Sequence, residues 1–163
     1  MAKGMVYIFS GEGRGKSAVT IGRAVQAATE GKRTVIIQFL KQRGLEDSEF
    51  LRRMEPEIKL FRFEKSGEDF EKLPEGKKQE EIGNIKNGIN FARKVLATGE
   101  CDLLILDEVL GVVEKEIVES KELMSILSSR EDTDIILTGV NLPEDIRTLA
   151  DEVSRIETAK YGV

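Results

Sequence analysis

Short apolar runs and helical patterns alternate along this chain. The predicted strands, most of which are short apolar runs, cover residues 5–9, 34–40, 58–63, 102–106, 133–137 and 152–156. The predicted helices, of which the second and the last are short, cover residues 17–30, 44–54, 80–98, 117–127 and 143–150. Most of the strands are apolar throughout, as in a parallel sheet that is covered on both faces. The pattern therefore predicts an α/β fold with three layers and a mostly parallel sheet.

One segment interrupts this alternation. Residues 64–78 contain Gly67, Pro74 and Gly76 among many charged side chains, which predicts a mobile surface loop of the kind that often serves as a lid. The 163 residues contain no internal repeat and no low-complexity linker. Because a chain of this length forms one ordinary domain with a real core, residues 1–163 are expected to be a single domain.

The turn after the first strand is rich in glycine. Residues 10–17 read S-G-E-G-R-G-K-S and match the phosphate-loop pattern G-x-x-x-x-G-K-[ST] except at Ser10, which replaces the first glycine. Glycines let backbone N–H groups approach phosphate oxygens, and the following helix adds its positive end. An ordinary glycine-rich turn is the alternative, but the strand before and the helix after the loop favour binding of the triphosphate of ATP. The residues predicted to contact the nucleotide are Gly11, Glu12, Gly13, Arg14, Gly15, Lys16, Ser17 and Ala18.

A second motif complements the phosphate loop. The run L-L-I-L-D-E ends an apolar strand in Asp107 and Glu108, an arrangement in which a carboxylate meets Mg²⁺ directly or through water. The alternative for Asp107 is the N-cap of a following helix. Taken with the loop, the motif predicts a Mg²⁺ site made by Ser17, Asp107 and Glu108. Lys16, which would neutralise phosphate charge, and Glu108 are the predicted catalytic residues.

Charge and cysteine content narrow the classes of function. The formal net charge of −5 argues against non-specific nucleic-acid binding, which normally uses a net basic face. Cys101 is the single cysteine, so an internal disulfide is impossible. No stretch approaches the roughly 20 apolar residues of a spanning helix, and the N-terminus lacks the apolar region of a secretory signal. We therefore expect a cytoplasmic protein with no nucleic-acid or membrane partner.

The chain contains no histidine. Histidine-based catalytic triads and histidine metal sites are therefore excluded. Any chemistry must come from carboxylates, lysines, hydroxyls, a metal held by oxygen, or the reactivity of the substrates themselves.

Several motifs together resemble the P-loop type ATP:corrinoid adenosyltransferases. The similar segments are the loop at residues 10–17, V-I-I-Q-F-L-K at 35–41, L-I-L-D-E-V at 104–109, I-L-T-G at 136–139 followed by Pro143, and A-D-E-V at 150–153. The resemblance implies a RecA-like P-loop nucleotide-binding fold and a homodimer. It also implies transfer of the 5′-deoxyadenosyl group of ATP to Co(I) of a corrinoid, with release of triphosphate. Because Co(I) is itself the nucleophile, such a reaction needs no general base, which suits a chain without histidine.

The resemblance also implies substrate-binding residues outside the loop. Gln38 and Lys41 belong to the Q-F-L-K segment, which a generic ATPase does not need. Phe61 and Phe63 align near the family's aromatic G-F-x-W segment, which faces the corrin. Strand alternation puts both rings on the same face of the strand, where they either meet the flat corrin or pack into the core.

The chain departs from the family pattern at four places. It has no tryptophan, Val140 stands where arginine usually follows Thr-Gly, the C-terminus stops short of the usual tail, and almost nothing precedes the first strand. Two other functions therefore stay open. One is a non-catalytic nucleotide or corrinoid binder, and the other is a P-loop ATPase or kinase in which Glu108 activates water or a hydroxyl.

Overall fold

The computed structural model describes residues 3–41 and 48–162. Within these ranges the strands are β1 (Val6–Ser10), β2 (Thr34–Gln38), β3 (Ile58–Arg62), β4 (Leu103–Asp107), β5 (Asp134–Thr138) and β6 (Glu152–Arg155). The helices are α1 (Lys16–Thr29), α2 (Glu49–Arg52), the 3-10 turn η1 (Phe70–Lys72), α3 (Glu75–Thr98), α4 (Val109–Glu114), α5 (Ser120–Ser128) and α6 (Glu144–Arg147). In the described part of the chain, no helix is both long enough and apolar enough to cross a membrane.

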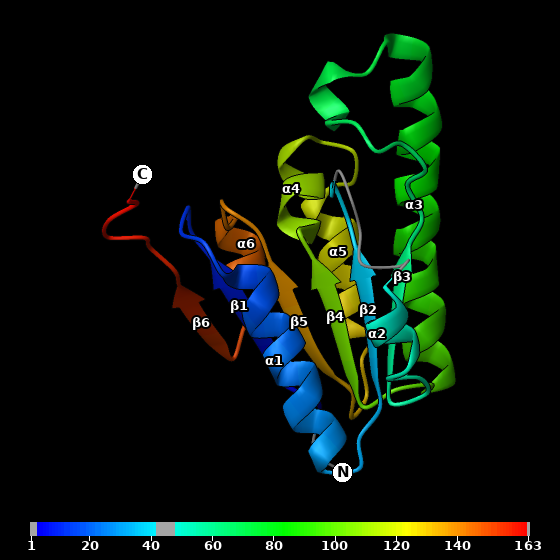
Figure 1. Cartoon of the computed structure of the whole chain (residues 1–163), viewed down its shortest axis with the longest axis vertical. Helices are drawn as coiled ribbons and strands as arrows, with labels where there is room; N and C mark the ends of the chain where they lie inside the picture. Colours follow the sequence, from blue (N-terminus) through cyan, green and yellow to red (C-terminus); the bar gives the residue numbers. More distant parts are fainter. Residues whose placement is uncertain (1–2, 42–47, 163) are drawn as a thin grey trace.

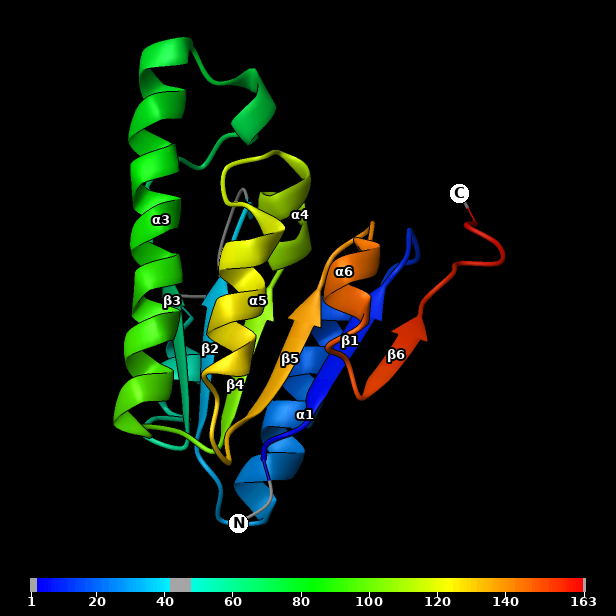
Figure 2. The same ribbon diagram turned by 180° about the vertical axis from the view of Figure 1, so that it is seen from behind.

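The strands form one sheet in the order β3-β2-β4-β5-β1-β6, and every neighbouring pair is parallel. Helix α1 covers one face of this sheet, and α3, α5 and α6 cover the other (Figures 1 and 2). Successive residues of β4 alternate between the layers: Ile105 packs with the α1 side, whereas Leu104 and Leu106 pack with the α3 and α5 side. Burial on both faces explains why β2 and β4 carry apolar residues on both faces, and the predicted three-layer α/β fold is confirmed.

The end of β2 and the start of α3 differ from their predicted positions. β2 ends at Gln38 rather than at residue 40, because Leu40 takes a left-handed φ of 56° that no strand accommodates. α3 begins at Glu75, directly after Pro74, so the end of the loop predicted at 64–78 is helical. Proline is well suited to this place because its fixed φ and missing N–H cost nothing at a helix start.

The short helices were predicted less well. The helix expected at 117–127 begins at Ser120, and α4 was not predicted at all. Residues 109–112 of α4 are all buried, so the segment lacks the polar face that makes a helix visible in a sequence. Of the helix expected at 44–54, α2 covers Glu49–Arg52, and residues 42–47 lie outside the described residues.

The parallel arrangement brings the segments that carry the sequence motifs to one edge of the sheet. The carboxyl ends of β1, β2, β4 and β5 lie side by side there, with Gln38 level with Asp107 and Phe9 level with Thr138. Helix α3 and η1 extend beyond this edge, next to the end of β3 (Figures 1 and 2). The loops at this edge form the candidate site, as is usual for open α/β sheets.

Candidate active site

The glycine-rich loop joins β1 to α1. Gly11 and Gly15 have φ angles of 107° and 101°, in the region that glycine adopts without strain. The Lys16 ammonium turns back into the loop and donates to the carbonyl oxygens of Gly11 at 2.6 Å and Gly13 at 2.7 Å. The loop therefore combines a central lysine with the start of the 14-residue helix α1, two features that attract phosphate.

The segment after β6 packs along the outer side of the loop. The Gly13 N–H donates to the Ile156 carbonyl at 2.9 Å, and the Arg14 N–H donates to Thr158 Oγ1 at 2.8 Å. A Cβ at Gly13 would lie 2.6 Å from the Ile156 carbonyl, which leaves room for glycine alone. The Arg14 guanidinium lies 3.7 Å from the centre of the Tyr161 ring and donates to its hydroxyl, so this side chain faces the C-terminal segment.

Cavities lie on both sides of the loop. One of about 240 Å³ is lined by residues 13–18 of the loop together with Lys41 and Glu108. Another, of about 770 Å³, lies between the loop and the C-terminal segment and is bordered by Glu12, Asn141 and Arg155. The smaller cavity thus collects most of the residues predicted to bind phosphate and metal, whereas Glu12 faces the larger one.

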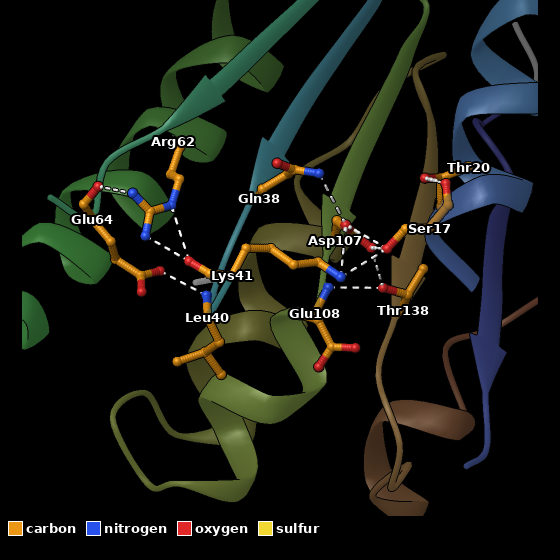
Figure 3. Close-up of polar contacts among 10 residues, drawn as sticks. All are labelled: Ser17, Thr20, Gln38, Leu40, Lys41, Arg62, Glu64, Asp107, Glu108 and Thr138. Carbon is orange, nitrogen blue, oxygen red and sulfur yellow. Dashed lines mark hydrogen bonds and ion pairs between the residues drawn. The ribbon is translucent and has the colours of Figure 1, made fainter. Parts of the chain in front are cut away.

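Asp107 ends β4 in a network of donors and is only 1% exposed. Its carboxylate accepts hydrogen bonds from Ser17 Oγ at 3.0 Å, from Thr138 Oγ1 at 2.7 Å and from Gln38 Nε2 at 3.4 Å (Figure 3). The N-cap position of α4 is Glu108, not Asp107, so helix capping does not account for this aspartate. A buried carboxylate surrounded by hydroxyl and amide donors is held in one orientation, facing the phosphate loop.

Glu108 occupies the turn between β4 and α4. It adopts a left-handed φ of 64°, and its N–H donates to Thr138 Oγ1 at 2.7 Å. Burial raises the pKa of its carboxyl, an effect opposed by the ammonium groups of Lys41 and Lys16 and reinforced by Asp107. The unusual backbone conformation is therefore held by β5 and directs Glu108 to the small cavity.

Lys41 reaches this network from the end of β2. Its Nζ donates to Ser17 Oγ at 2.9 Å and lies 3.8 Å from Asp107 Oδ2 (Figure 3). Lys41 and Lys16 therefore approach the same small cavity from two different loops. Two cations beside a helix start make a site for a multiply charged anion.

Ser17, Asp107 and Glu108 also give the oxygen ligands expected of a Mg²⁺ site. Among the residues that the structure describes, no three Cys, Asp or Glu side chains converge on one point. Mg²⁺ does not need such a cage, because it binds one or two protein carboxylates together with substrate phosphates and water. The Ser17 hydroxyl and the Asp107 carboxylate, 3.0 Å apart, suit that mode of binding.

Phe61 and Phe63 lie apart from the phosphate loop. Both side chains are half-buried, and their ring centres lie 4.7 Å and 5.4 Å from that of Phe91 in α3. They share one face of the β3 end, as strand alternation predicts, and this face is packed on α3. The predicted site residues thus fall into two groups, a phosphate and metal cluster and an aromatic cluster beside it.

Three residues of this region were not assigned a role from the sequence. Thr138 joins Asp107 to Glu108, and its only visible signal was a hydroxyl residue at the end of an apolar strand. Arg62 and Glu64 hold the main chain next to Lys41 (Figure 3). Their contacts join residues more than 20 positions apart, which no local pattern reveals.

Comparisons with known proteins identify the family and the fold of this chain. The family model of ATP:corrinoid adenosyltransferase BtuR/CobO/CobP matches residues 2–163. The corrinoid adenosyltransferase of Escherichia coli (strain K12) is 26% identical over 161 residues, which cover 98% of this chain and 80% of that protein. The crystal structure of flagellar accessory protein FlaH from Methanocaldococcus jannaschii shares the fold, with a TM-score of 0.59 and 19% identity over 98% of this chain and 73% of that one. AMPPCP-bound DnaA from Aquifex aeolicus gives a TM-score of 0.47 at 19% identity over 95% of this chain, which spans only 41% of that structure.

Proposed function

Because this chain belongs to the ATP:corrinoid adenosyltransferase family, whose model spans residues 2–163, we propose that it transfers the 5′-deoxyadenosyl group of ATP to Co(I) of a corrinoid. The observation that carries the proposal is the meeting of the phosphate loop with Lys41 and Glu108 around one small cavity, beside the buried carboxylate of Asp107. The phosphate loop, Lys41 and Glu108 follow the carboxyl ends of β1, β2 and β4, so the parallel sheet brings them together.

The proposed reaction is a nucleophilic displacement at C5′. The electron pair of Co(I) forms the cobalt–carbon bond, the C5′–O bond breaks, and its electron pair leaves with the triphosphate. The corrinoid enters already reduced by an external electron donor. No proton is transferred, so the protein acts by holding the leaving group, aligning C5′ with cobalt and excluding water.

Lys16 is proposed to bind the triphosphate. Its ammonium now donates to two carbonyl oxygens of the loop, Gly11 O and Gly13 O, and phosphate oxygens would replace these acceptors. The N–H groups at the start of α1 add further donors. Lys41 lies across the cavity and is proposed to contact the same anion, which stabilises the negative charge that grows on the leaving group.

We propose that Mg²⁺ accompanies ATP, held by the Ser17 hydroxyl and the Asp107 carboxylate with Glu108 nearby. The position of the Lys41 ammonium supports this, because a cation already lies 2.9 Å from Ser17 Oγ and 3.8 Å from Asp107 Oδ2. When bound there, the metal would neutralise charge on the triphosphate. Asp107 keeps its orientation through Thr138 and needs no rearrangement to act as a ligand.

Phe61 and Phe63 are proposed to contribute to the corrinoid face, with the segment between β3 and α3 covering it. The half-buried state of both rings supports this, since each keeps surface that a flat macrocycle could bury. An aromatic wall would also keep water from the lower side of cobalt, where a water ligand makes reduction to Co(I) harder. Packing on Phe91 would hold the two rings in place.

The remaining proposals concern the whole molecule. We propose that residues 1–163 act as one P-loop domain within a homodimer in the cytoplasm, without a nucleic-acid or membrane partner. The single sheet supports one domain, and the net charge of −5 and the free Cys101 support the proposed partners and compartment. The homodimer is proposed from the family alone. Sedimentation equilibrium should give twice the mass of one chain. A measured mass equal to that of one chain would contradict the dimer.

Phosphorus NMR of the products tests the proposed reaction. Protein, Mg·ATP and a chemically reduced corrinoid should yield triphosphate, and none should form when the corrinoid is left out. Lys16→Ala should abolish this product, whereas Lys32→Ala, at an exposed lysine 3.2 Å from Glu30, should retain it. Inorganic phosphate would instead identify an ATPase, and ATP binding without any product would identify a non-catalytic binder.

A further inference from the structure

The main chain just after β2 has an unusual conformation. Leu40 has a left-handed φ of 56°, which is rare for a residue with a branched side chain and costs free energy unless its surroundings enforce it. Its N–H donates to Glu64 Oε1 at 2.7 Å (Figure 3). Its side chain packs against Gly111 of α4, where an added Cβ would lie 2.9 Å from Leu40 Cδ1. Contacts from the segment after β3 and from α4 thus enforce the turn that directs the next residue, Lys41.

Arg62 holds the other side of this turn. Its guanidinium donates to the carbonyl oxygen of Lys41 through Nε, at 3.2 Å, and through Nη2. The same group donates to the carbonyl oxygen of Glu64 at 2.8 Å (Figure 3) and to that of Ser66. The planar guanidinium of an arginine has five N–H donors in a fixed arrangement, enough to bond three carbonyl groups at once. The ammonium of a lysine is less well suited to join them.

The acceptor that holds Leu40 is itself fixed. Glu64 is only 7% exposed although it follows a strand in a segment rich in charge. The loop that carries it is anchored to α3 by Glu81, whose carboxylate accepts the N–H groups of Lys65 at 3.1 Å and Ser66 at 3.4 Å. Among the described contacts, Arg62 and Glu64 therefore hold the backbone of Leu40 and Lys41 from the end of β3 and the segment that follows it.

We propose that Arg62 and Glu64 are positioning residues, which hold the Leu40–Lys41 turn so that the Lys41 ammonium reaches Ser17 and Asp107. This inference deepens the proposed function and rests on it for the role of the phosphate site. A lysine side chain has four rotatable bonds, and fixing its backbone limits the freedom that it loses on binding. Arg62 and Glu64 would then act on nucleotide binding without touching the nucleotide.

The placement of Lys41 has a consequence for binding. Its ammonium lies against the same Ser17 and Asp107 oxygens that we assign to Mg²⁺. It therefore balances the charge of the buried Asp107 carboxylate, and bound Mg·ATP would offer it the triphosphate as its new partner. Loosening the Leu40–Lys41 turn should weaken Mg·ATP binding through Lys41 alone.

A double-mutant cycle on Mg·ATP affinity, measured by calorimetry, tests this route. Arg62→Met should weaken binding roughly tenfold in the natural background, the size expected for one loosened charge-assisted contact. In a Lys41→Met background the same change should alter affinity by less than about twofold, because the group through which it acts is gone. Equal effects in the two backgrounds would overturn the inference, since Arg62 would then act on the site or the fold directly.

Matched variants separate positioning from stability. Glu64→Gln keeps an oxygen that accepts the Leu40 N–H and should bind Mg·ATP nearly normally, whereas Glu64→Leu should reproduce the loss. Arg62→Lys replaces Arg62→Met in the cycle if the methionine variant does not fold. Arg93→Met removes an arginine of α3 that pairs with Glu122 of α5 at 2.9 Å, a pair that includes no residue of this turn, and it should leave affinity unchanged. A normal affinity in Glu64→Leu would contradict the role of Glu64.

A readout without nucleotide distinguishes failure of this inference from failure of the proposed function. Lysines can be dimethylated with ¹³C and followed by NMR, with the Lys41 signal identified by its absence in Lys41→Arg. If the protein binds no ATP, the proposed function fails, but Arg62→Met should still shift the Lys41 signal toward that of a free lysine. An unchanged Lys41 signal in Arg62→Met would overturn the positioning role.

Discussion

Thr138 donates its hydroxyl hydrogen to Asp107 Oδ1 at 2.7 Å and accepts the N–H of Glu108 at the same 2.7 Å. One hydroxyl thus orients both acidic residues of the proposed metal site. Thr138→Val keeps the shape of the side chain but removes one donor and one acceptor. We expect the free energy of unfolding to fall by about 1–3 kcal/mol, as for other buried hydrogen-bonding groups left unpaired. The Mg²⁺ dependence of ATP binding should weaken as well, which a metal titration by calorimetry measures.

Thr34→Val is the matched control for this substitution. Thr34 is 1% exposed, and its Oγ1 has no hydrogen-bond partner among the described residues. Removing that hydroxyl should leave stability unchanged or raise it, because nothing is left unpaired. A Thr138→Val protein as stable as Thr34→Val, with normal metal dependence, would show that the hydroxyl does not organise the site.

Glu64 should make stability depend on pH near neutrality. Burial raises the pKa of its carboxyl to about 7, against the opposing Leu40 N–H and Arg62, and Glu81 adds to the rise. The folded chain therefore keeps a proton that the unfolded chain releases above pH 4.5. Stability should fall as pH rises through this window and then level off above pH 7. The expected loss is about 3 kcal/mol at most.

Urea unfolding of the natural protein and Glu64→Gln at several pH values measures this effect. The glutamine mimics the protonated acid, so the difference between the two proteins should appear between about pH 5 and 8. Burial also raises the pKa of Glu108, but in both proteins alike. Subtracting one stability profile from the other therefore removes the contribution of Glu108. Parallel pH profiles for the two proteins would mean that Glu64 is ionised throughout.

Gly13→Ala should disturb the contact between the phosphate loop and the C-terminal segment. The new Cβ would lie 2.6 Å from the Ile156 carbonyl, and that approach requires the backbone to move. We expect a loss of stability of about 1–3 kcal/mol, as in other overpacked sites, together with weaker ATP binding. Gly22→Ala in α1 is the control, because its Cβ meets nothing within 4 Å and alanine favours the helix. The prediction fails if both variants have a melting temperature equal to or higher than that of the natural protein.

The double variant Phe61→Ala/Phe63→Ala tests the aromatic cluster. Both rings are half-buried on Phe91, so the loss of stability should stay below the roughly 3–5 kcal/mol that each fully buried phenylalanine contributes. ATP affinity should persist while corrinoid binding, followed by absorption, is lost. Phe50→Ala, at a ring that is 61% exposed in α2, is the control. A folded double variant that still binds corrinoid normally would remove these rings from the corrinoid face.

The features that local sequence determines were predictable. The loop at residues 10–17, the first apolar strand and the acidic end of β4 depend on residue type and short spacing, and each lies within one residue of where the pattern placed it. Because a parallel sheet brings the carboxyl ends of its strands together, the sequence alone predicts that Ser17 and Asp107 lie close to each other.

Long-range contacts account for what was not predictable. Glu64 stands among charged residues and reads as part of an exposed loop, yet it is buried because it holds the N–H of Leu40, 24 positions earlier. The apolar run through Leu40 reads as continuous strand, and only the contacts with Glu64 and Gly111 reveal the turn. Residues of this kind have no local sequence pattern, because their partners lie far away in the sequence and become neighbours only in the folded chain.

The coupled formation of two products tests the central claim most directly. The natural protein should be mixed in excess with a limiting amount of Co(I) corrinoid and Mg·ATP, and the light-sensitive adenosylcorrinoid and free triphosphate should be counted in the same sample. Adenosyl transfer predicts one triphosphate for each cobalt–carbon bond, and neither product without ATP. Triphosphate or phosphate in excess of adenosylcorrinoid, or a reduced corrinoid that stays unmodified beside bound ATP, would contradict the account.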